Sequence, residues 1–269
     1  MLAVWQAADD IEVFESGWTF DHFYPIFSDP TGPCLEGWVT LTALAQATTR
    51  LRVGVLVTGI HYRHPAVLAN MASTLDIVSG GRLELGIGAG WNEEESGAYG
   101  IALGTVRERF DRFEEACEVL TGLLSQETTS FDGSFYRLTE ARNEPKGPQR
   151  PHPPICIGGN GEKRTLRITA RYADHWNFVG GPPEEFARKR DVLAAHCADV
   201  GRDPKDIMLS AHVRLNPERD YDRVIDQAAA LGAEGLDMAI VYLPPPYDPA
   251  VLEPLAERIR ESGLASKDS

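Results

Sequence analysis

Apolar positions along the 269-residue chain alternate between a short, strand-like pattern and a longer pattern with helical spacing. Apolar or β-rich runs of three to nine residues recur, and a segment with apolar residues every three or four positions follows each one. We expect strands at residues 18–20, 51–58, 83–87, 155–157, 175–179, 207–215 and 235–241. We expect helices at residues 2–14, 35–48, 66–78, 108–125, 162–172, 183–201, 221–231 and 249–262.

Repeated strand–helix units predict a parallel sheet with right-handed crossovers. Seven strands, each followed by a helix, and one helix in front of them indicate an α/β fold of the TIM (β/α)8 barrel type that lacks its first strand. A barrel of this length is commonly one domain, so we expect a single domain over residues 1–269. A hairpin turned at Asp132-Gly133 and a Pro-rich segment form an insertion at about residues 127–154. The Pro-rich part, residues 142–154, is a candidate lid.

The chain opens directly into its first predicted helix and leaves no room for the first strand of a barrel. The apolar residues of this helix are spaced by three, which is not a strand pattern. We therefore expect that the natural start lies upstream, and that roughly 20–30 residues, about one strand and its loop plus the start of the helix, are absent.

Composition limits the kinds of molecule that the chain is expected to bind and the compartment in which it is expected to work. The net charge of −14 argues against binding to nucleic acid or to an anionic membrane. The four cysteines lie far apart without a CxxC pair, so we expect no metal site and a reducing, cytoplasmic location. No apolar run reaches membrane length, and the first residues lack the basic region of a secretory signal.

The glycines at Gly86, Gly88 and Gly90 end the third predicted strand. Their spacing is too tight for the dinucleotide-binding fingerprint, whose third glycine comes three residues after the second. The remaining interpretations are a ligand that approaches the backbone closely and a plain strand-to-helix turn. The acidic run at residues 93–95 that follows is a candidate for a catalytic carboxylate paired with Asp21, or a solvated helix start.

Barrel active sites lie at the carboxyl ends of the strands. Asp21 and His22 follow the first predicted strand, and a histidine there can exchange protons near neutral pH. The alternative for His22 is a structural histidine. His61 and His64 do not share a helix face, so a zinc site is not indicated.

A second glycine-rich turn, residues 158–161, opens the helix predicted at residues 162–172. That helix begins with Lys163, Arg164 and Arg167, and bare N–H groups, a helix dipole and cations together favour an anion site, most plausibly for phosphate. The alternative is a tight turn without a ligand.

Three long stretches resemble the bacterial luciferase-like monooxygenase superfamily, and more closely its actinobacterial branch of coenzyme F420-dependent oxidoreductases. They cover most of residues 18–178 and read WTFDHF, LRVGVLVTGIHYRHPAVLANMASTLDIVSGGRLELGIGAGWNEEESGAYG and NEPKGPQRPHPPICIGGNGEKRTLRITARYADHWNF. The C-terminal third matches only in architecture. The resemblance implies a (β/α)8 barrel that binds a flavin or deazaflavin at its carboxyl face.

The resemblance also implies site residues. Asp21 and His22 would lie over the reactive centre of the ring, with His22 as the catalytic residue. A non-prolyl cis bond at Leu56–Val57 would form a bulge behind the ring. The implied cofactor-binding residues are Asp21, His22, Leu56, Val57, Thr58, Asn92, Gly159, Asn160 and Gly161, the last three at the phosphate.

We therefore predict an oxidoreductase that uses coenzyme F420 for hydride transfer to or from a small organic substrate, assembled as a homodimer. The alternatives are an FMN-dependent monooxygenase and a non-catalytic flavin-binding barrel. A Schiff-base lyase is disfavoured because no Lys stands at a predicted strand end. Sugar-phosphate dehydrogenases of the family have a glutamate where this chain has Ala89. Neither their acid–base partner nor their sugar-phosphate substrate therefore carries over to this chain.

Overall fold

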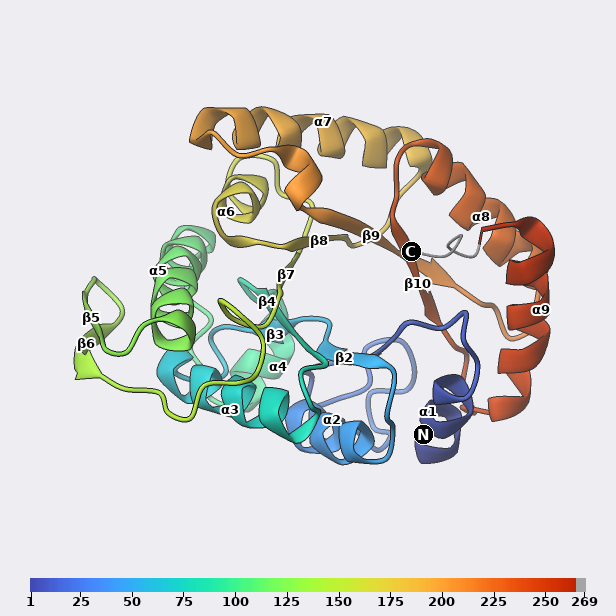
Figure 1. The fold of residues 1–269 in the computed structure, drawn as a ribbon, viewed down its shortest axis with the longest axis horizontal. Coiled ribbons are helices and arrows are strands. Elements are labelled where there is room, and N and C mark those ends of the chain that lie inside the picture. Colours follow the sequence, from blue (N-terminus) through green and yellow to red (C-terminus); the bar gives the residue numbers. More distant parts are fainter. Residues whose placement is uncertain (265–269) are drawn as a thin grey trace. The chain divides into compact units, whose positions relative to one another are not determined.

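The predicted alternation of strands and helices is present throughout residues 1–264, which the computed structural model describes (Figure 1). These residues divide into two compact units, which we describe separately. Unit 1 comprises residues 1–17, 47–51 and the chain from Gly159 onward. Unit 2 comprises residues 18–46 and 52–158. The assignment of the whole chain to one domain stays a prediction.

Unit 2 is built on a parallel sheet. β2 (Arg52–Val55) pairs with β4 (Leu83–Gly88), which pairs with β7 (Ile155–Gly158) and with the two-residue β3 (Thr58–Gly59). Beyond the end of β2, the Leu56 N–H donates to Thr19 at the end of β1 (Ser16–Thr19) over 2.8 Å. The residues of β4 do not alternate between core and solvent, because all six are buried. A parallel strand covered on both faces is buried in this way.

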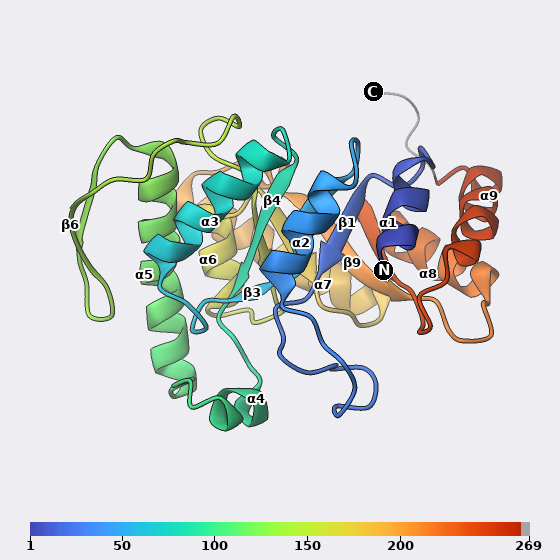
Figure 2. The same ribbon diagram turned by 90° about the horizontal axis from the view of Figure 1, so that it is seen from below.

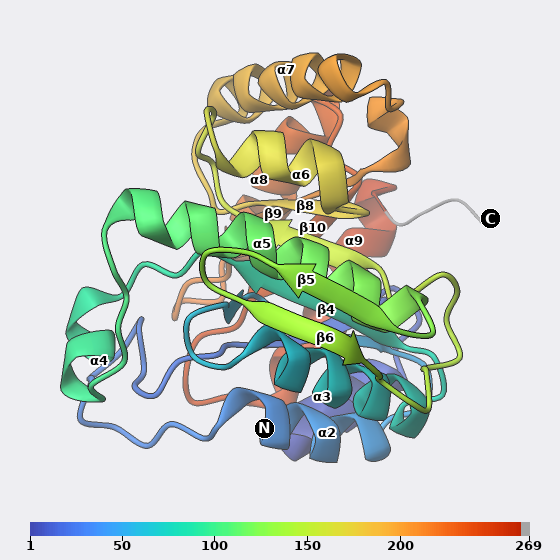
Figure 3. The ribbon, with the colours of Figure 1, turned by 90° about the vertical axis from the view of Figure 1, so that its left-hand side faces the viewer.

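Helices and a hairpin complete unit 2. The helices are α2 (Gly37–Gln46), α3 (Pro65–Val78), α4 (Glu93–Ala98) and α5 (Val106–Ser125). The predicted hairpin is present as the antiparallel strands β5 (Thr129–Asp132) and β6 (Arg137–Ala141), which run beside α5 (Figure 3). The Glu115 carboxylate of α5 accepts the N–H groups of residues 134–136 and so holds the hairpin turn on the helix.

The candidate lid, residues 142–154, lies at the opposite edge of the sheet from the carboxyl ends of the strands (Figure 2). Asn143 is buried and donates to Ser73 of α3 over 2.8 Å. Gln149 donates to Asp76, near the end of α3, and to the Leu83 carbonyl at the amino end of β4. The expectation of a lid is therefore wrong, because the segment is anchored where β4 begins.

Unit 1 contains a second run of parallel pairing, β8 (His175–Phe178), β9 (Met208–Arg214) and β10 (Met238–Tyr242) (Figure 1). Its helices are α1 (Leu2–Asp9), α6 (Thr165–Tyr172), α7 (Pro183–Val200), α8 (Tyr221–Ala233) and α9 (Leu252–Ser262), with short 3-10 turns η1 (Pro204–Asp206) and η2 (Pro249–Val251). Trp176 of β8 stacks on Phe186 of α7 at 5.8 Å between ring centroids, and both belong to the buried core of this unit.

The first helix ends at Asp9, five residues earlier than its apolar spacing predicts. The Asp9 carboxylate accepts the N–H groups of Thr49, Arg50 and Leu51, at 2.7, 2.9 and 2.9 Å. Burial opposes ionisation, but these hydrogen bonds outweigh it and lower the pKa of Asp9 to about 2. A carboxylate that ties two distant segments together in this way contributes stability only while it is ionised.

We expect Asp9→Asn to lower the free energy of unfolding at neutral pH by about 1–2 kcal/mol, because charge-assisted hydrogen bonds at a partly exposed site are lost. The folded pKa lies below the ordinary value, so this stability is present above about pH 4 and is lost as the pH falls toward 2. Urea unfolding at a series of pH values measures it. The neighbouring Asp10→Asn is the control, and equal effects of the two substitutions would contradict the assignment.

Among residues 1–264, no helix is both long enough and apolar enough to cross a membrane.

Candidate active site

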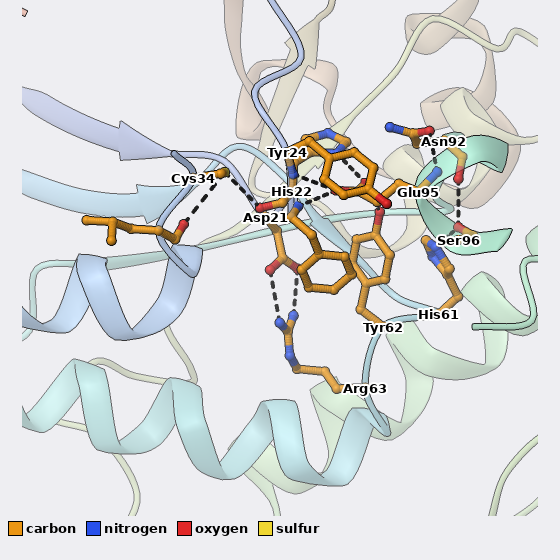
Figure 4. A network of polar contacts seen from close by, with 12 residues as sticks. Asp21, His22, Tyr24, Cys34, His61, Tyr62, Arg63, Asn92, Glu95 and Ser96 are labelled. Carbon is orange, nitrogen blue, oxygen red and sulfur yellow. Dashed lines mark hydrogen bonds and ion pairs between the residues drawn. The ribbon is translucent and has the colours of Figure 1, made fainter. Parts of the chain in front are cut away.

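Three loops of unit 2 meet at the carboxyl ends of its strands (Figure 4). The loop after β1 carries Asp21 and His22, the loop after β3 carries Tyr62 and Arg63, and the loop after β4 leads into α4, which carries Glu95. Strand ends that point to one edge of a parallel sheet bring such loops together. This edge is where the sequence predicts the site.

A buried carboxylate holds the catalytic candidate. The Nδ1 atom of His22 lies 2.7 Å from Oε2 of Glu95, and the Glu95 side chain is 0% exposed. The same oxygen accepts the Tyr62 hydroxyl at 2.6 Å. Oε1 accepts the backbone N–H of Phe23 in a short hydrogen bond and that of Tyr24 at 3.3 Å. One side chain thus connects the loop after β1, the loop after β3 and α4.

The hydrogen bonds keep Glu95 ionised. Burial alone raises the pKa of this carboxyl, but the donors Tyr62, Phe23 and His22 together hold the pKa of Glu95 below its usual value. The reverse effect acts on the phenol, because burial and the Glu95 carboxylate both raise the pKa of Tyr62. The site therefore contains a carboxylate and a protonated phenol at neutral pH.

Asp21 has a different partner. Its side chain is 1% exposed, and both carboxylate oxygens accept from Arg63, over 2.6 and 2.9 Å. Burial raises the pKa of Asp21, while the hydrogen bonds and the charge of Arg63 oppose that rise. Arg63 also reaches Glu36 at 3.4 Å. Asp21 and Glu95 bind different partners. The expectation of a catalytic carboxylate pair formed by Asp21 and the acidic run is therefore wrong.

The three glutamates of the acidic run differ in burial. Glu93 and Glu94 are exposed, as a solvated helix start should be, whereas Glu95 is fully buried. The sequence indicates a helix start at the acidic run, but it predicts neither the extent of α4 nor the pairing of Glu95 with His22. A signal for α4 was present, because Asn92 followed three residues later by Glu95 is the pattern of a capped helix start. Which of the three carboxylates turns inward is not readable from that pattern.

Aromatic rings surround His22. Its ring lies at 5.5 Å from Trp91 and 6.5 Å from Phe20, both edge-on. Phe23 stacks on Tyr99 at 4.3 Å. Trp91 and Tyr99 are 62% and 54% exposed. The rim around His22, whose own side chain is 12% exposed, and around the buried Glu95 is therefore both apolar and accessible.

The strand predicted at residues 51–58 is interrupted. The Leu56–Val57 peptide bond is cis, as the resemblance implies, and it separates β2 from β3. Val57 packs onto two glycines, because a Cβ atom on Gly88 would lie 2.8 Å from the Val57 side chain and one on Gly158 would lie 3.1 Å from it. The bulge is thus supported from β4 and from β7. Thr58 is fully buried and its hydroxyl accepts the indole N–H of Trp38 at 3.0 Å.

Asn92 stands at the start of α4. Its side-chain oxygen accepts the N–H of Glu95 at 3.1 Å, which is the usual arrangement of a helix N-cap. Asn92 therefore fixes the helix that presents Glu95. Its role at a cofactor stays a prediction.

The predicted phosphate turn belongs to unit 1. α6 begins at Thr165, so the expectation that the helix opens at residue 162 is wrong. The Gly159 N–H donates to the Asn177 carbonyl at 3.1 Å, and the Asn160 side-chain oxygen accepts the Val179 N–H at 3.0 Å. Gly159 has φ of +131°, which a glycine adopts readily. Phosphate binding by Gly159, Asn160 and Gly161 stays a prediction.

Solved structures show the same fold. An F420-dependent secondary alcohol dehydrogenase in complex with an F420–acetone adduct superimposes with a TM-score of 0.82 at 20% identity, over 98% of this chain and 94% of that one. The coenzyme F420-dependent tetrahydromethanopterin reductase of Methanopyrus kandleri gives a TM-score of 0.79 at 17% identity, over 95% and 93%. The fold is therefore the α/β fold of the TIM-barrel type found in luciferase-like F420 enzymes, as predicted.

Sequence comparison gives a consistent result. The F420-dependent hydroxymycolic acid dehydrogenase of Mycobacterium tuberculosis (strain ATCC 25618 / H37Rv) is 33% identical over 215 residues, which are 76% of this chain and 55% of that protein. The chain spans between 54% and 64% of the length of the curated relatives it matches. The model of the family described as luciferase-like monooxygenase matches residues 4–262. With its fold and this match over nearly all of its length, the chain belongs to the luciferase-like monooxygenase family.

Proposed function

We propose that the chain is a coenzyme F420-dependent oxidoreductase that transfers a hydride between the deazaflavin and an organic alcohol or carbonyl substrate. The observation that carries this proposal is the His22 imidazole, held by the buried Glu95 carboxylate at the carboxyl end of β1. A histidine anchored through one ring nitrogen can exchange a proton through the other. Interconversion of an alcohol and a carbonyl needs that proton transfer as well as the hydride.

The residues of unit 2 fit a flat ring cofactor. The Leu56–Val57 bulge is backed by Gly88 and Gly158, which leave no space into which the Val57 side chain could retreat. The bulge can therefore act as a firm support for a ring. When bound, the deazaflavin would accept or donate the hydride, and that chemistry belongs to the cofactor.

The protein would handle the proton. In alcohol oxidation, the substrate C–H bond breaks as the hydride leaves, the hydroxyl proton passes to Nε2 of His22, and the C–O bond becomes a carbonyl. In the reverse direction, Nε2 returns the proton to the oxygen as the hydride reaches carbon. While Nε2 holds the substrate proton, the His22 ring is an imidazolium. Glu95 stabilises this cation because its carboxylate lies 2.7 Å from Nδ1.

Relatives support this choice of cofactor. The mycobacterial dehydrogenase and the proteins of the two solved structures are all named as F420-dependent. Two of the curated relatives, both from M. tuberculosis, are named as a hydroxymycolic acid dehydrogenase and a phthiodiolone/phenolphthiodiolone dimycocerosates ketoreductase, names that point to alcohol and ketone chemistry. The substrate of this chain, its homodimeric assembly and its cytoplasmic location stay predictions.

Binding titrations of the purified protein with coenzyme F420 and with FMN, followed by the fluorescence of each cofactor, test the proposal. We expect saturable binding of coenzyme F420 and no comparable binding of FMN. Tight binding of FMN alone would favour the FMN-dependent monooxygenase. Binding of neither cofactor would favour a barrel without redox chemistry and would overturn the proposed function.

A further inference from the structure

We propose that Glu95 is a positioning residue that holds the neutral His22 imidazole in its Nδ1–H tautomer, so that Nε2 is the nitrogen that faces the substrate. The structural part of this proposal concerns only unit 2. Its catalytic consequence rests on the proposed function.

The first argument is the number of donors around Glu95. The carboxylate is 0% exposed, and each of its oxygens is shared by two donors. Oε1 accepts the N–H groups of Phe23 and Tyr24, and Oε2 accepts the Tyr62 hydroxyl and faces Nδ1 of His22. Backbone N–H groups can only donate, so they fix the role of Oε1 without ambiguity.

The second argument is the charge on Glu95. An ionised carboxylate accepts and cannot donate, so the 2.7 Å contact requires a proton on Nδ1. Other ionisable groups leave this arrangement intact. The phenol of Tyr62 keeps its proton, and burial followed by the charge of Arg112 lowers the pKa of His61 to about 4, so that His61 is neutral. Burial, with Glu95 as the second cause, raises the pKa of the Cys34 thiol.

Asp21, Glu94 and Arg63 do not compete for the contact. Asp21 is bound on both oxygens by Arg63, which also reaches Glu36. Glu94, the other acid beside Glu95, is exposed. Glu95 is therefore the carboxylate that contacts Nδ1 and sets its proton.

The third argument is that one side chain orients both the ring and its backbone. By accepting from Phe23 and Tyr24, Glu95 fixes the main chain directly after His22, and by accepting from Nδ1 it fixes the ring. Trp91 packs edge-on against the ring at 5.5 Å. A side chain held through its own hydrogen bonds and through its backbone loses little freedom when substrate binds.

The substitution Glu95→Gln separates positioning from packing, because it has nearly the same shape. The two backbone N–H groups require the amide oxygen at the Oε1 position, which places the amide NH₂ against Nδ1 of His22. The NH₂ group then donates to Nδ1, so the imidazole must move its proton to Nε2. The control is Glu94→Gln, which removes the same charge from the exposed neighbouring position of α4.

The test is ¹⁵N NMR of the imidazole nitrogens in the cofactor-free protein at alkaline pH, with the His22 signals assigned by their loss in His22→Asn. We expect the Nδ1–H pattern in the unsubstituted protein and in Glu94→Gln, and the Nε2–H pattern in Glu95→Gln. An Nε2–H pattern in the unsubstituted protein would overturn the proposal even if Glu95→Gln failed to fold. Unchanged tautomers in a folded Glu95→Gln protein would overturn it as well.

Turnover gives a second readout. We expect Glu95→Gln to lower kcat by roughly 100-fold or more, as loss of a positioned acid–base group does, with little change in the affinity for coenzyme F420. Glu94→Gln should leave both unchanged. A folded Glu95→Gln protein with the kcat of the unsubstituted enzyme would contradict the positioning role. Failure of the unsubstituted protein to bind coenzyme F420 would instead count against the proposed function and leave the NMR result standing.

Discussion

His22→Ala is expected to lower kcat by about 10²- to 10⁴-fold, the usual contribution of a general acid–base group. The imidazole lies at the carboxyl end of β1, and its Nδ1 is occupied by Glu95, so Nε2 is the atom available for proton exchange. The proton transfer occurs in the transition state, so the affinity for coenzyme F420 should change little. Steady-state turnover and a fluorescence titration measure the two quantities.

The matched control for His22→Ala is His64→Asn. His64 is an exposed histidine of unit 2, and its side chain accepts the Ala66 N–H as the N-cap of α3. Asparagine is a good N-cap, so the substitution removes an imidazole without unfolding the helix. Turnover should be unaffected. Equal kcat values for the His22→Ala and unsubstituted proteins would show that His22 is a structural histidine.

Arg63→Met is expected to lower the free energy of unfolding by about 3–5 kcal/mol, because it leaves a buried carboxylate without its partner. Both oxygens of Asp21 depend on Arg63, and the Asp21 side chain is 1% exposed. Methionine keeps much of the apolar length of arginine, so the loss reports the charge pair more than the packing. Denaturant unfolding measures the effect, with the dependence of the unfolding free energy on denaturant concentration compared between variants.

Two further variants show whether the lost stability of Arg63→Met comes from the buried ion pair with Asp21 or from the contact with Glu36. Asp21→Leu combined with Arg63→Met removes both charges and should recover most of the lost stability, since a buried ion pair replaced by apolar groups costs little. Glu36→Gln removes the charge of the 40% exposed partner that Arg63 reaches at 3.4 Å, and it should cost less than about 1 kcal/mol. A loss of under about 1 kcal/mol in Arg63→Met would mean that the pair contributes no more than a surface salt bridge.

The sequence by itself determined the architecture and the edge at which the site lies. The alternation of short apolar runs and helical spacing is a local property, because each strand or helix must bury a particular face. It predicted the parallel sheet and the hairpin, with every strand except the two-residue β3. It did not predict the exact ends of the elements or the short helices α4, η1 and η2. The resemblance supplied the family and the cis bond at Leu56–Val57, both of which are confirmed.

Only the tertiary structure decided which side chains meet. His22 and Glu95 are 73 residues apart, and Asp21 and Arg63 are 42 apart, so no local period connects them. Their pairing depends on where the loops after β1, β3 and β4 lie once the sheet has formed. The same holds for the segment 142–154, whose prolines indicate irregular backbone but not that Gln149 is anchored at the amino end of β4. Burial supplies the physical reason, because it selects Glu95 from three neighbouring glutamates by matching it to donors that come from distant parts of the chain.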